Sequence, residues 1–225
     1  MLICVFGNSG SGKDYVISKA LELAKETGTD LTRMKMVTDR PKRKDEDSSY
    51  YEFLTKKEFS ELIYDKELIE FRCYDTQFGV WRYGTTNKIW KEVLNPDKSY
   101  ITTCTPRQFT KLWNNTPKVF RCQLQPIVLE VSDTTRLLRM IERVDGNFVQ
   151  LQEVCRRFAN DEEYLDTSKI DSSIKYSNSG SDNLRKIVLD ILRLANYPQQ
   201  GYPNYDESIE DKLGTLLHYD FKGEE

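Results

Sequence analysis

The sequence predicts an α/β fold in which helices cover both faces of a parallel β-sheet. Strand-like and helix-like segments alternate from the N-terminus to about residue 195. Several of the strand-like segments are short continuous apolar runs, as in strands that are buried on both faces. The chain of 225 residues, 38% of them apolar, is long enough for one large core with small inserted lobes.

The first expected strand is Leu2–Phe6, a continuous apolar run. A helix should follow it, because apolar side chains then recur at helical spacing. Its apolar face consists of Val16, Ile17, Ala20, Leu21 and Ala24. Thr27 and Gly28 predict its end, since glycine commonly terminates helices.

The same two patterns predict the remaining elements. Further strands are expected at residues 34–37, 100–104, 126–131 and 174–176. Further helices are expected after Thr55, from Pro106 to Trp113, after Ser132 or Asp133, around 151–158, and after Ser181 or Asp182. Residues 40–51 are polar and charge-dense, which indicates a binding loop or a solvated lobe edge. Residues 74–87 are rich in aromatic and turn residues, and residues 196–205 indicate a linker. Residues 209–217 indicate either a short docking helix or part of a disordered tail.

Composition excludes several classes of protein. The net charge of −3 and a pI of about 5.5 argue against general nucleic-acid binding. No apolar run is long enough to span a membrane, and no secretory leader is recognisable. The five cysteines form no CxxC pair, so we expect reduced, structural thiols in a cytoplasmic protein. Because His218 is the only histidine, histidine triads and zinc sites with several histidines are excluded.

The stretch from Gly7 to Lys13 carries the strongest functional signal. It reads Gly-Asn-Ser-Gly-Ser-Gly-Lys between the first strand and its helix, which is the context of a phosphate-binding loop. Backbone N–H groups of such a loop bind phosphate oxygens, and Lys13 would hold the β- and γ-phosphates of ATP. The expected ATP-binding residues are Asn8, Ser9, Gly10, Ser11, Gly12, Lys13 and Asp14. The alternative is a glycine-rich turn with an exposed lysine.

Asp14 departs from the usual pattern of this loop. The position is normally Ser or Thr, whose hydroxyl binds Mg²⁺. A carboxylate beside a triphosphate is unfavourable unless a metal ion lies between them. We therefore expect either that Asp14 binds Mg²⁺, directly or through water, or that it weakens the site.

Five downstream segments resemble, in order, motifs of the guanylate kinase family of nucleoside monophosphate kinases. They are Thr38–Glu46, Tyr50–Phe53, Thr55–Phe59, Leu68–Phe71 and Val80–Thr85. The family motifs are T-T-R-x-P-R-x-G-E, D-Y-x-F, S-x-E-E-F, F-L-E-W and G-N-x-Y-G-T/S. The resemblance extends from about Leu2 to Leu194, and the phosphate-binding loop precedes all five segments.

The resemblance implies a P-loop fold of three αβα layers with a parallel sheet, an inserted lobe for the nucleoside monophosphate (NMP) and a small helical lid. The implied core comprises residues 1–36, 96–138 and 158–195; the NMP-binding lobe is 37–95, the lid 139–157 and the tail 196–225. The implied activity is phosphorylation of an NMP to the diphosphate with ATP and Mg²⁺, with GMP or dGMP as the first candidate. The partners would then be small-molecule nucleotides, and the protein a monomer or homodimer.

The resemblance also assigns residues to the two substrates. The implied NMP-binding residues are Thr38, Arg40, Arg43, Tyr51, Glu70, Tyr83 and Thr85. Arg40 and Arg43 suit bidentate contacts with the acceptor phosphate. Glu70 could accept hydrogen bonds from guanine N1–H and its amino group, while Thr85 could meet O6. The alternatives are a solvated basic loop at 40–44 and packing of Tyr51 against Phe53.

Arginines of the implied lid would complete the site. The implied catalytic residues are Lys13, Arg40, Arg43, Arg139, Arg143 and Arg156. Arg139 and Arg143 are four residues apart and would share a helical face, and Arg157 is an alternative to Arg156. Together they would neutralise charge on the transferred phosphoryl group. The alternative is that some are surface arginines paired with Glu142 or Glu153.

Three departures from the family pattern leave the base open. Thr103 and Thr105 stand where the family has two aspartates near guanine and Mg²⁺, and Met36 replaces a serine that contacts the base. Asp14 could compensate for the lost strand carboxylate. The Gly-Lys-Asp end of the loop is also similar to some viral deoxynucleotide kinases. Alternatives are therefore a different or modified nucleotide, another phosphate acceptor, or a binding module without turnover.

Overall fold

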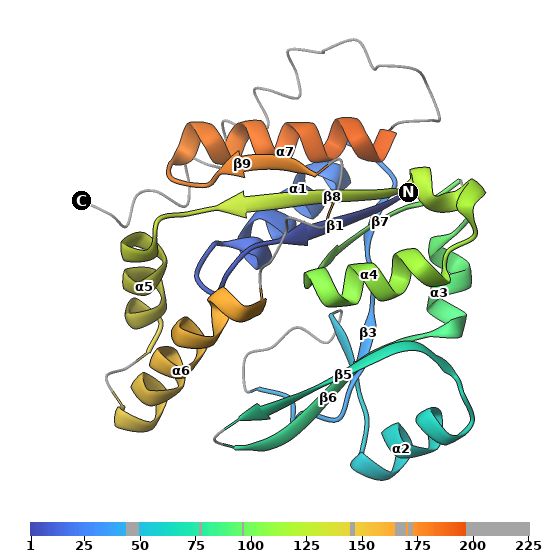
Figure 1. Cartoon of the computed structure of the whole chain (residues 1–225). Helices are drawn as coiled ribbons and strands as arrows, with labels where there is room; N and C mark the ends of the chain where they lie inside the picture. The colour runs from blue at the N-terminus through green and yellow to red at the C-terminus, as the bar shows by residue number, and fades with distance from the viewer. Residues whose placement is uncertain are drawn as a thin grey trace.

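The computed structural model describes residues 1–43, 50–76, 78–95, 97–144, 147–164, 170 and 173–196. Its larger sheet has five parallel strands in the order β2-β7-β1-β8-β9. They are β2 (Leu31–Arg33), β7 (Ser99–Thr103), β1 (Leu2–Phe6), β8 (Leu124–Glu130) and β9 (Ile174–Ser177). The predicted α/β fold with a parallel sheet is confirmed, and Figure 1 shows helices on both faces of it.

Strand β1 lies at the centre of the sheet and is completely buried. Its odd-numbered residues Ile3 and Val5 pack with α1 (Lys13–Thr27) and α7 (Ser181–Asn196). Its even-numbered residues, Leu2, Cys4 and Phe6, face a second core cluster. That cluster includes side chains of α3 (Asn87–Val93) and α4 (Pro106–Asn115), among them Trp90 and Leu112. The continuous apolar run therefore reflects burial on both faces.

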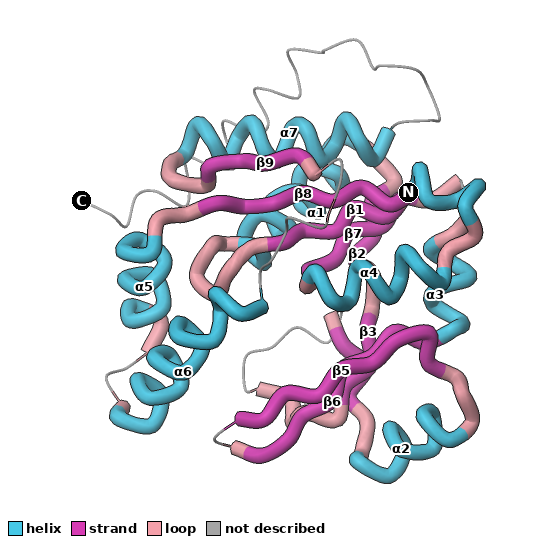
Figure 2. Tube along the Cα trace, in the orientation of Figure 1, coloured by secondary structure: helices cyan, strands magenta, loops and turns pink. Residues whose placement is uncertain are grey.

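The part of the chain that follows β2 and precedes β7 in the sequence forms an inserted lobe with a second, smaller sheet (Figure 2). Its strands are β4 (Tyr51–Phe53), β3 (Met36–Thr38), β6 (Gly79–Thr86) and β5 (Leu68–Thr76), in that spatial order. Helix α2 (Lys56–Tyr64) begins with a capping box between Thr55 and Glu58. Strands β5 and β6 form an antiparallel hairpin that contains most of the aromatic, turn-rich segment noted in the sequence.

The strand expected at residues 34–37 is wrong in its bounds. The backbone N–H of Met34 still donates to Ile101 in the large sheet, whereas that of Met36 donates to Tyr50 in the lobe. The chain thus leaves the large sheet after Met34, which directly follows β2, and enters the lobe sheet at Met36, the first residue of β3. Sequence periodicity could not detect this, because both halves are buried and apolar.

Two helices follow β8 and lie beyond the carboxyl-terminal end of that strand (Figure 1). They are α5 (Asp133–Glu142), capped by Ser132, which is one of the two predicted caps, and α6 (Phe148–Tyr164). A 3₁₀ helix at Lys118–Gln123 leads into β8. Within the described ranges, no helix combines the length and apolarity needed to cross a membrane. The predictions for residues 197–225, including the one for His218, lie outside the described residues.

All five cysteines are free thiols. Cys4 and Cys104 are buried, as expected for small hydrophobic residues, while Cys73, Cys122 and Cys155 are exposed.

Candidate active site

The glycine-rich loop connects β1 to α1 as predicted, and two of its glycines are required by the fold. Gly10 and Gly12 have φ values of 80° and 86°, which only glycine adopts readily. A Cβ on Gly10 would lie 2.4 Å from the Arg136 carbonyl oxygen, and one on Gly12 would lie 2.7 Å from Asn178 Nδ2. Asn178, which follows β9, also donates to the Ser11 carbonyl at 2.8 Å. The loop is thus held against α5 and the end of β9.

Lys13 bends back over this loop. Its Nζ donates to the carbonyl oxygens of Gly7 at 2.7 Å and Asn8 at 2.9 Å. Burial lowers the pKa of the Lys13 ammonium, an effect that the carboxylates of Asp14 and Asp161 oppose. Neutral carbonyls are weaker partners for an ammonium than phosphate oxygens are. A bound anion would therefore be a stronger partner for the Lys13 ammonium than the carbonyl oxygens of Gly7 and Asn8 are.

Asp14 is paired with a cation in this structure. Its carboxylate lies 2.8 Å from Arg33 Nη2, and the Arg33 guanidinium stacks 3.7 Å from the centre of the Tyr50 ring. The Asp14 side chain is 73% exposed, so one carboxylate is presented beside the phosphate loop. The part of the chain that the structure describes contains no group of three His, Cys, Asp or Glu side chains suited to a metal. One carboxylate is nevertheless sufficient for Mg²⁺, which commonly takes its other ligands from substrate phosphates and water.

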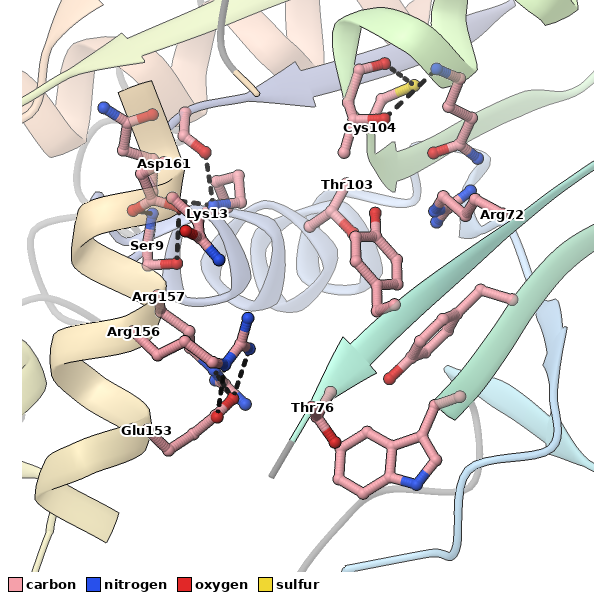
Figure 3. A pocket seen from close by; sticks show the side chains of 18 of the residues that line it. Ser9, Lys13, Arg72, Thr76, Thr103, Cys104, Glu153, Arg156, Arg157 and Asp161 are labelled. Carbon is pink, nitrogen blue, oxygen red and sulfur yellow. Dashed lines mark hydrogen bonds and ion pairs between the residues drawn. The ribbon is translucent and has the colours of Figure 1, made fainter. Parts of the chain in front are cut away.

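A cavity of about 340 Å³ joins the phosphate loop to the inserted lobe. Its phosphate-loop end is lined by Gly7, Asn8, Ser9 and Lys13, and by Glu153, Arg156, Arg157, Asn160 and Asp161 of α6. Its aromatic end is lined by Tyr51, Arg72, Tyr74, Trp81, Tyr83 and Gln108. Figure 3 shows Lys13 and Asp161 on one side of this space and Arg72 on the other. The cavity therefore brings together residues from the two predicted binding regions.

The two arginines that were predicted to bind the acceptor phosphate, Arg40 and Arg43, occupy different environments. Arg43 is exposed and lines the cavity. Arg40 is buried, donates to the Pro41 carbonyl at 2.9 Å and lies 5.7 Å from the Tyr51 ring centre. Thr38 is also buried, and its hydroxyl donates to the Arg82 carbonyl at 2.7 Å. Of these three, Arg43 is the one placed to meet a ligand directly.

Two predicted tyrosines form the wall of the aromatic end. The rings of Tyr51 and Tyr83 meet edge to face with centres 5.7 Å apart, and Tyr83 meets Tyr74 in the same way at 5.6 Å. Burial, reinforced by the neighbouring Tyr83, raises the pKa of Tyr51 to about 12. Its phenol therefore stays protonated and able to donate a hydrogen bond at neutral pH. Contact between the Tyr51 and Phe53 rings, the packing alternative, is also present at 6.1 Å.

Glu70 and Thr85 lie together but are set back from the cavity. Glu70 is buried in β5, and its Oε1 accepts from the Thr85 hydroxyl at 2.8 Å. The same carboxylate is paired with Arg72 at 3.2 Å. Thr105 serves as the N-cap of α4, accepting from the Gln108 N–H at 3.2 Å. Both Thr105 and Thr103 line the cavity, but neither supplies the carboxylate that the family has there.

The predicted lid arginines lie on or next to α5 and α6. Arg156 and Arg157 line the cavity, and both pair with Glu153, at 2.7 and 2.8 Å. The alternative of pairing with Glu153 is thus confirmed for these two. Arg139 donates to the Asn178 carbonyl at 3.3 Å. Arg143 is exposed at the end of α5.

Four residues that sequence reasoning missed also belong to this region: Arg72, Gln108, Arg136 and Asp161. Arg136 is 1% exposed and pairs with Asp133 at 2.7 Å and Asp161 at 2.8 Å. Asp161 in turn accepts hydrogen bonds from the Ser9 backbone N–H at 2.7 Å and the Ser9 hydroxyl at 3.1 Å. Strand alternation could have found Arg72, two residues after Glu70 on the same face, but no local pattern marks the other three.

The family model described as guanylate kinase matches residues 1–126. A guanylate kinase of Mycoplasmoides gallisepticum is 30% identical over 102 residues, which cover 45% of this chain and 49% of that protein. One of Prochlorococcus marinus is 24% identical over 155 residues, covering 69% and 75% of the two chains. The match thus spans about half the length of the first relative. The crystal structure of guanylate kinase from Anaplasma phagocytophilum has the same fold, with a TM-score of 0.52, 21% identity and coverage of 91% and 87%.

Proposed function

The chain belongs to the guanylate kinase family, and from this premise we propose that it transfers the γ-phosphoryl group of ATP to a nucleoside monophosphate. GMP or dGMP is the proposed acceptor, and two diphosphates are the products. One observation carries the proposal: a phosphate-binding loop and an aromatic, arginine-bearing end line the same cavity. A kinase of this kind holds both substrates in one cavity, and closure of the enzyme around them excludes water from that cavity.

The phosphate-loop end is the proposed ATP site. Backbone N–H groups of the loop and the N-terminus of α1 favour a bound anion. Lys13 would exchange the Gly7 and Asn8 carbonyls for β- and γ-phosphate oxygens, which are stronger partners for its ammonium. Asp14 would hold Mg²⁺ together with the phosphates, and the ion would supply charge neutralisation at the transferred group. Asn8, Ser9, Gly10, Ser11 and Gly12 complete this proposed site.

The aromatic end is the proposed NMP site. Arg43 and the phenols of Tyr51 and Tyr83 line the cavity where the acceptor phosphate would lie. Arg40 and Thr38 are buried beside these tyrosines: the Arg40 guanidinium lies 5.7 Å from the centre of the Tyr51 ring, and Thr38 is the register partner of Tyr83 between β3 and β6. No general base is required, because a phosphate monoester with a second pKa of about 6 is already anionic at neutral pH.

Helices α5 and α6 supply the proposed lid. Arg156 lies on the cavity wall, paired with Glu153, and could turn toward the transferred phosphoryl group. Arg139 lies beside the loop through its hydrogen bond to Asn178, and Arg143 is close enough to lower the pKa of Lys13. Charges that are fixed around the phosphoryl group stabilise it as it passes between substrates.

The test is ADP formation from MgATP with a panel of ribo- and deoxynucleoside monophosphates. We expect turnover with at least one purine monophosphate and its loss in Lys13→Ala, with the fold intact. Lys25→Ala is the matched control, since Lys25 is exposed on the same helix. ATP binding without turnover across the whole panel would refute the kinase proposal and indicate a binding module.

A further inference from the structure

A buried polar cluster closes the aromatic end of the cavity. Glu70 is its acceptor: Oε1 receives the Thr85 hydroxyl at 2.8 Å, Gln108 Nε2 at 3.2 Å and Arg72 Nη1 at 3.2 Å. The sulfur of Met36 lies 3.6 Å from Arg72 Nη2 and 3.5 Å from Gln108 Nε2. Glu70 and Met36 together hold Arg72 and Gln108 in place.

The order of these residues from the cavity inward is informative. Arg72 and Gln108 are among the residues that line the cavity, whereas Glu70, Thr85 and Met36 are not. The Glu70 side chain is 1% exposed and that of Arg72 is 15% exposed. A base that enters the aromatic end therefore meets the guanidinium and the amide before it meets the carboxylate.

The charge of the cluster points to the edge of the base that it recognises. The Arg72 guanidinium neutralises Glu70, so the carboxylate no longer presents a free anion to base N–H donors. Among the residues that the structure describes, two buried atoms of this cluster find no hydrogen-bond partner: Arg72 Nε, a donor, and Gln108 Oε1, an acceptor. Buried polar atoms without partners destabilise a fold, and a ligand that pairs with them gains that free energy. An arginine can only donate, so it selects a base edge that carries acceptors.

We propose that Arg72 and Gln108 select the acceptor base, and that Arg72 reads guanine through its O6 and N7 acceptors. Bidentate pairing of a guanidinium with O6 and N7 is the most frequent specific contact of arginine with guanine. Glu70 is then a positioning residue that orients Arg72 and Gln108, instead of receiving guanine N1–H and the amino group itself. This inference rests on the proposed function, because it assumes that a guanine monophosphate occupies the aromatic end.

The first test compares three nucleotides on the unmodified protein: dGMP, 7-deaza-dGMP, which lacks N7, and dIMP, which lacks the 2-amino group. Calorimetric titration without ATP measures binding independently of turnover. We expect 7-deaza-dGMP to bind about tenfold more weakly than dGMP, the loss of one good base contact, while dIMP binds within about twofold of dGMP. The reverse order would overturn the proposal, and so would tighter binding of dAMP or dCMP than of dGMP when these two are titrated in the same way.

Variants then assign the effect to Arg72. Removing the guanidinium alone would leave the Glu70 carboxylate buried without its ion pair, so the informative variant combines Arg72→Met with Glu70→Gln. This double variant should bind dGMP and 7-deaza-dGMP equally. Arg72→Lys keeps the charge beside Glu70 but loses the planar pair of donors, so it should also lose most of the N7 preference. An N7 preference that persists in the double variant would contradict the role of Arg72.

The same titrations separate this inference from the kinase proposal. Binding of dGMP with the predicted N7 preference but without ADP formation would refute the kinase and retain the base-selection inference. Turnover of dGMP with no N7 preference would retain the kinase and refute the inference. Failure to bind any monophosphate would refute both.

Discussion

Asp161 of α6 occupies part of the phosphate loop that ATP is proposed to use. Its carboxylate accepts from the Ser9 N–H at 2.7 Å, from the Ser9 hydroxyl at 3.1 Å and from Arg136 Nη1 at 2.8 Å. The side chain is only 16% exposed, so these contacts are poorly screened. A carboxylate that binds a loop N–H is an internal competitor for a phosphate oxygen. We therefore expect Asp161 to oppose ATP binding while stabilising the nucleotide-free fold.

Asp161→Asn tests this opposition, because it removes the charge with almost no change of shape. Hydrogen bonds to a charged group stabilise by about 1.5–3 kcal/mol, and Arg136 keeps Asp133 as a second partner. The free energy of unfolding should accordingly fall by about 2 kcal/mol. ATP must also displace the side chain of residue 161 from Ser9, and the free energy that this displacement requires should be smaller in Asp161→Asn. The decrease is about 1.4 kcal/mol if the asparagine amide keeps one of the two hydrogen bonds with Ser9. That difference corresponds to an ATP Kd about tenfold lower.

Urea unfolding and calorimetric titration with MgATP measure the two effects separately. Asp133→Asn is the matched control, because Asp133 pairs with the same Arg136 but is 65% exposed and makes no described contact with Ser9. It should destabilise by less than about 1 kcal/mol and leave the ATP Kd unchanged. If Asp161→Asn binds ATP with equal or lower affinity than the unmodified protein, the competition argument is wrong.

Three further results are expected. The pKa of Tyr51 should be about 12 instead of 10.0, and absorbance at 295 nm, with the Tyr51→Phe variant subtracted, measures that pKa. The stability that the protonated phenol contributes is therefore present below pH 10 and is lost as the pH rises toward 12. Gly10→Ala should lower the free energy of unfolding by more than about 3 kcal/mol, because the added Cβ combines a positive φ with a backbone clash. Gly28→Ala should cost about 1 kcal/mol, since Gly28 also has a positive φ but its added Cβ would meet no atom within 4 Å. Similar losses for the two variants in urea unfolding would contradict the clash. Asp14→Ala should raise the Mg²⁺ concentration at half-maximal rate and Arg33→Ala should lower it, by freeing the carboxylate; an unchanged value in both would remove Asp14 from the metal site.

Much of the fold could be predicted from the sequence, because buried parallel strands and amphipathic helices leave direct patterns. Leu2–Phe6 is apolar throughout since both of its faces pack against helices. The cap at Thr55 could also be predicted, and Ser132 was one of two candidate caps together with Asp133, because each hydroxyl lies where a free helix N–H needs an acceptor. The passage from one sheet to another at Lys35 left no pattern, since it depends on which strand each backbone N–H reaches.

The candidate site shows a sharper limit on sequence reasoning. The loop from Gly7 to Lys13 could be located because its function depends on backbone conformation, which glycine spacing records. Asp161 could not, because it meets Ser9 across 152 positions of sequence and only packing of α6 brings them together. The expected pairing of the lid arginines was open for the same reason, and the structure decides it for Arg156 through Glu153 on the same helix.

Glu70 illustrates why a matched motif does not by itself transfer a role. A motif fixes the residue type and its place on β5, and both suit a carboxylate that reads guanine. It does not fix what stands between that carboxylate and the ligand. Arg72 follows Glu70 by two positions, so strand geometry places both side chains on one face of the sheet. The Arg72 cation therefore forms an ion pair with the buried Glu70 carboxylate. In this ion pair the Glu70 carboxylate accepts its hydrogen bond from Arg72, a donor, and it holds the Arg72 guanidinium in place. If Arg72 reads the base as proposed, this protein keeps the family's acidic residue and yet presents hydrogen-bond donors, instead of acceptors, to its substrate.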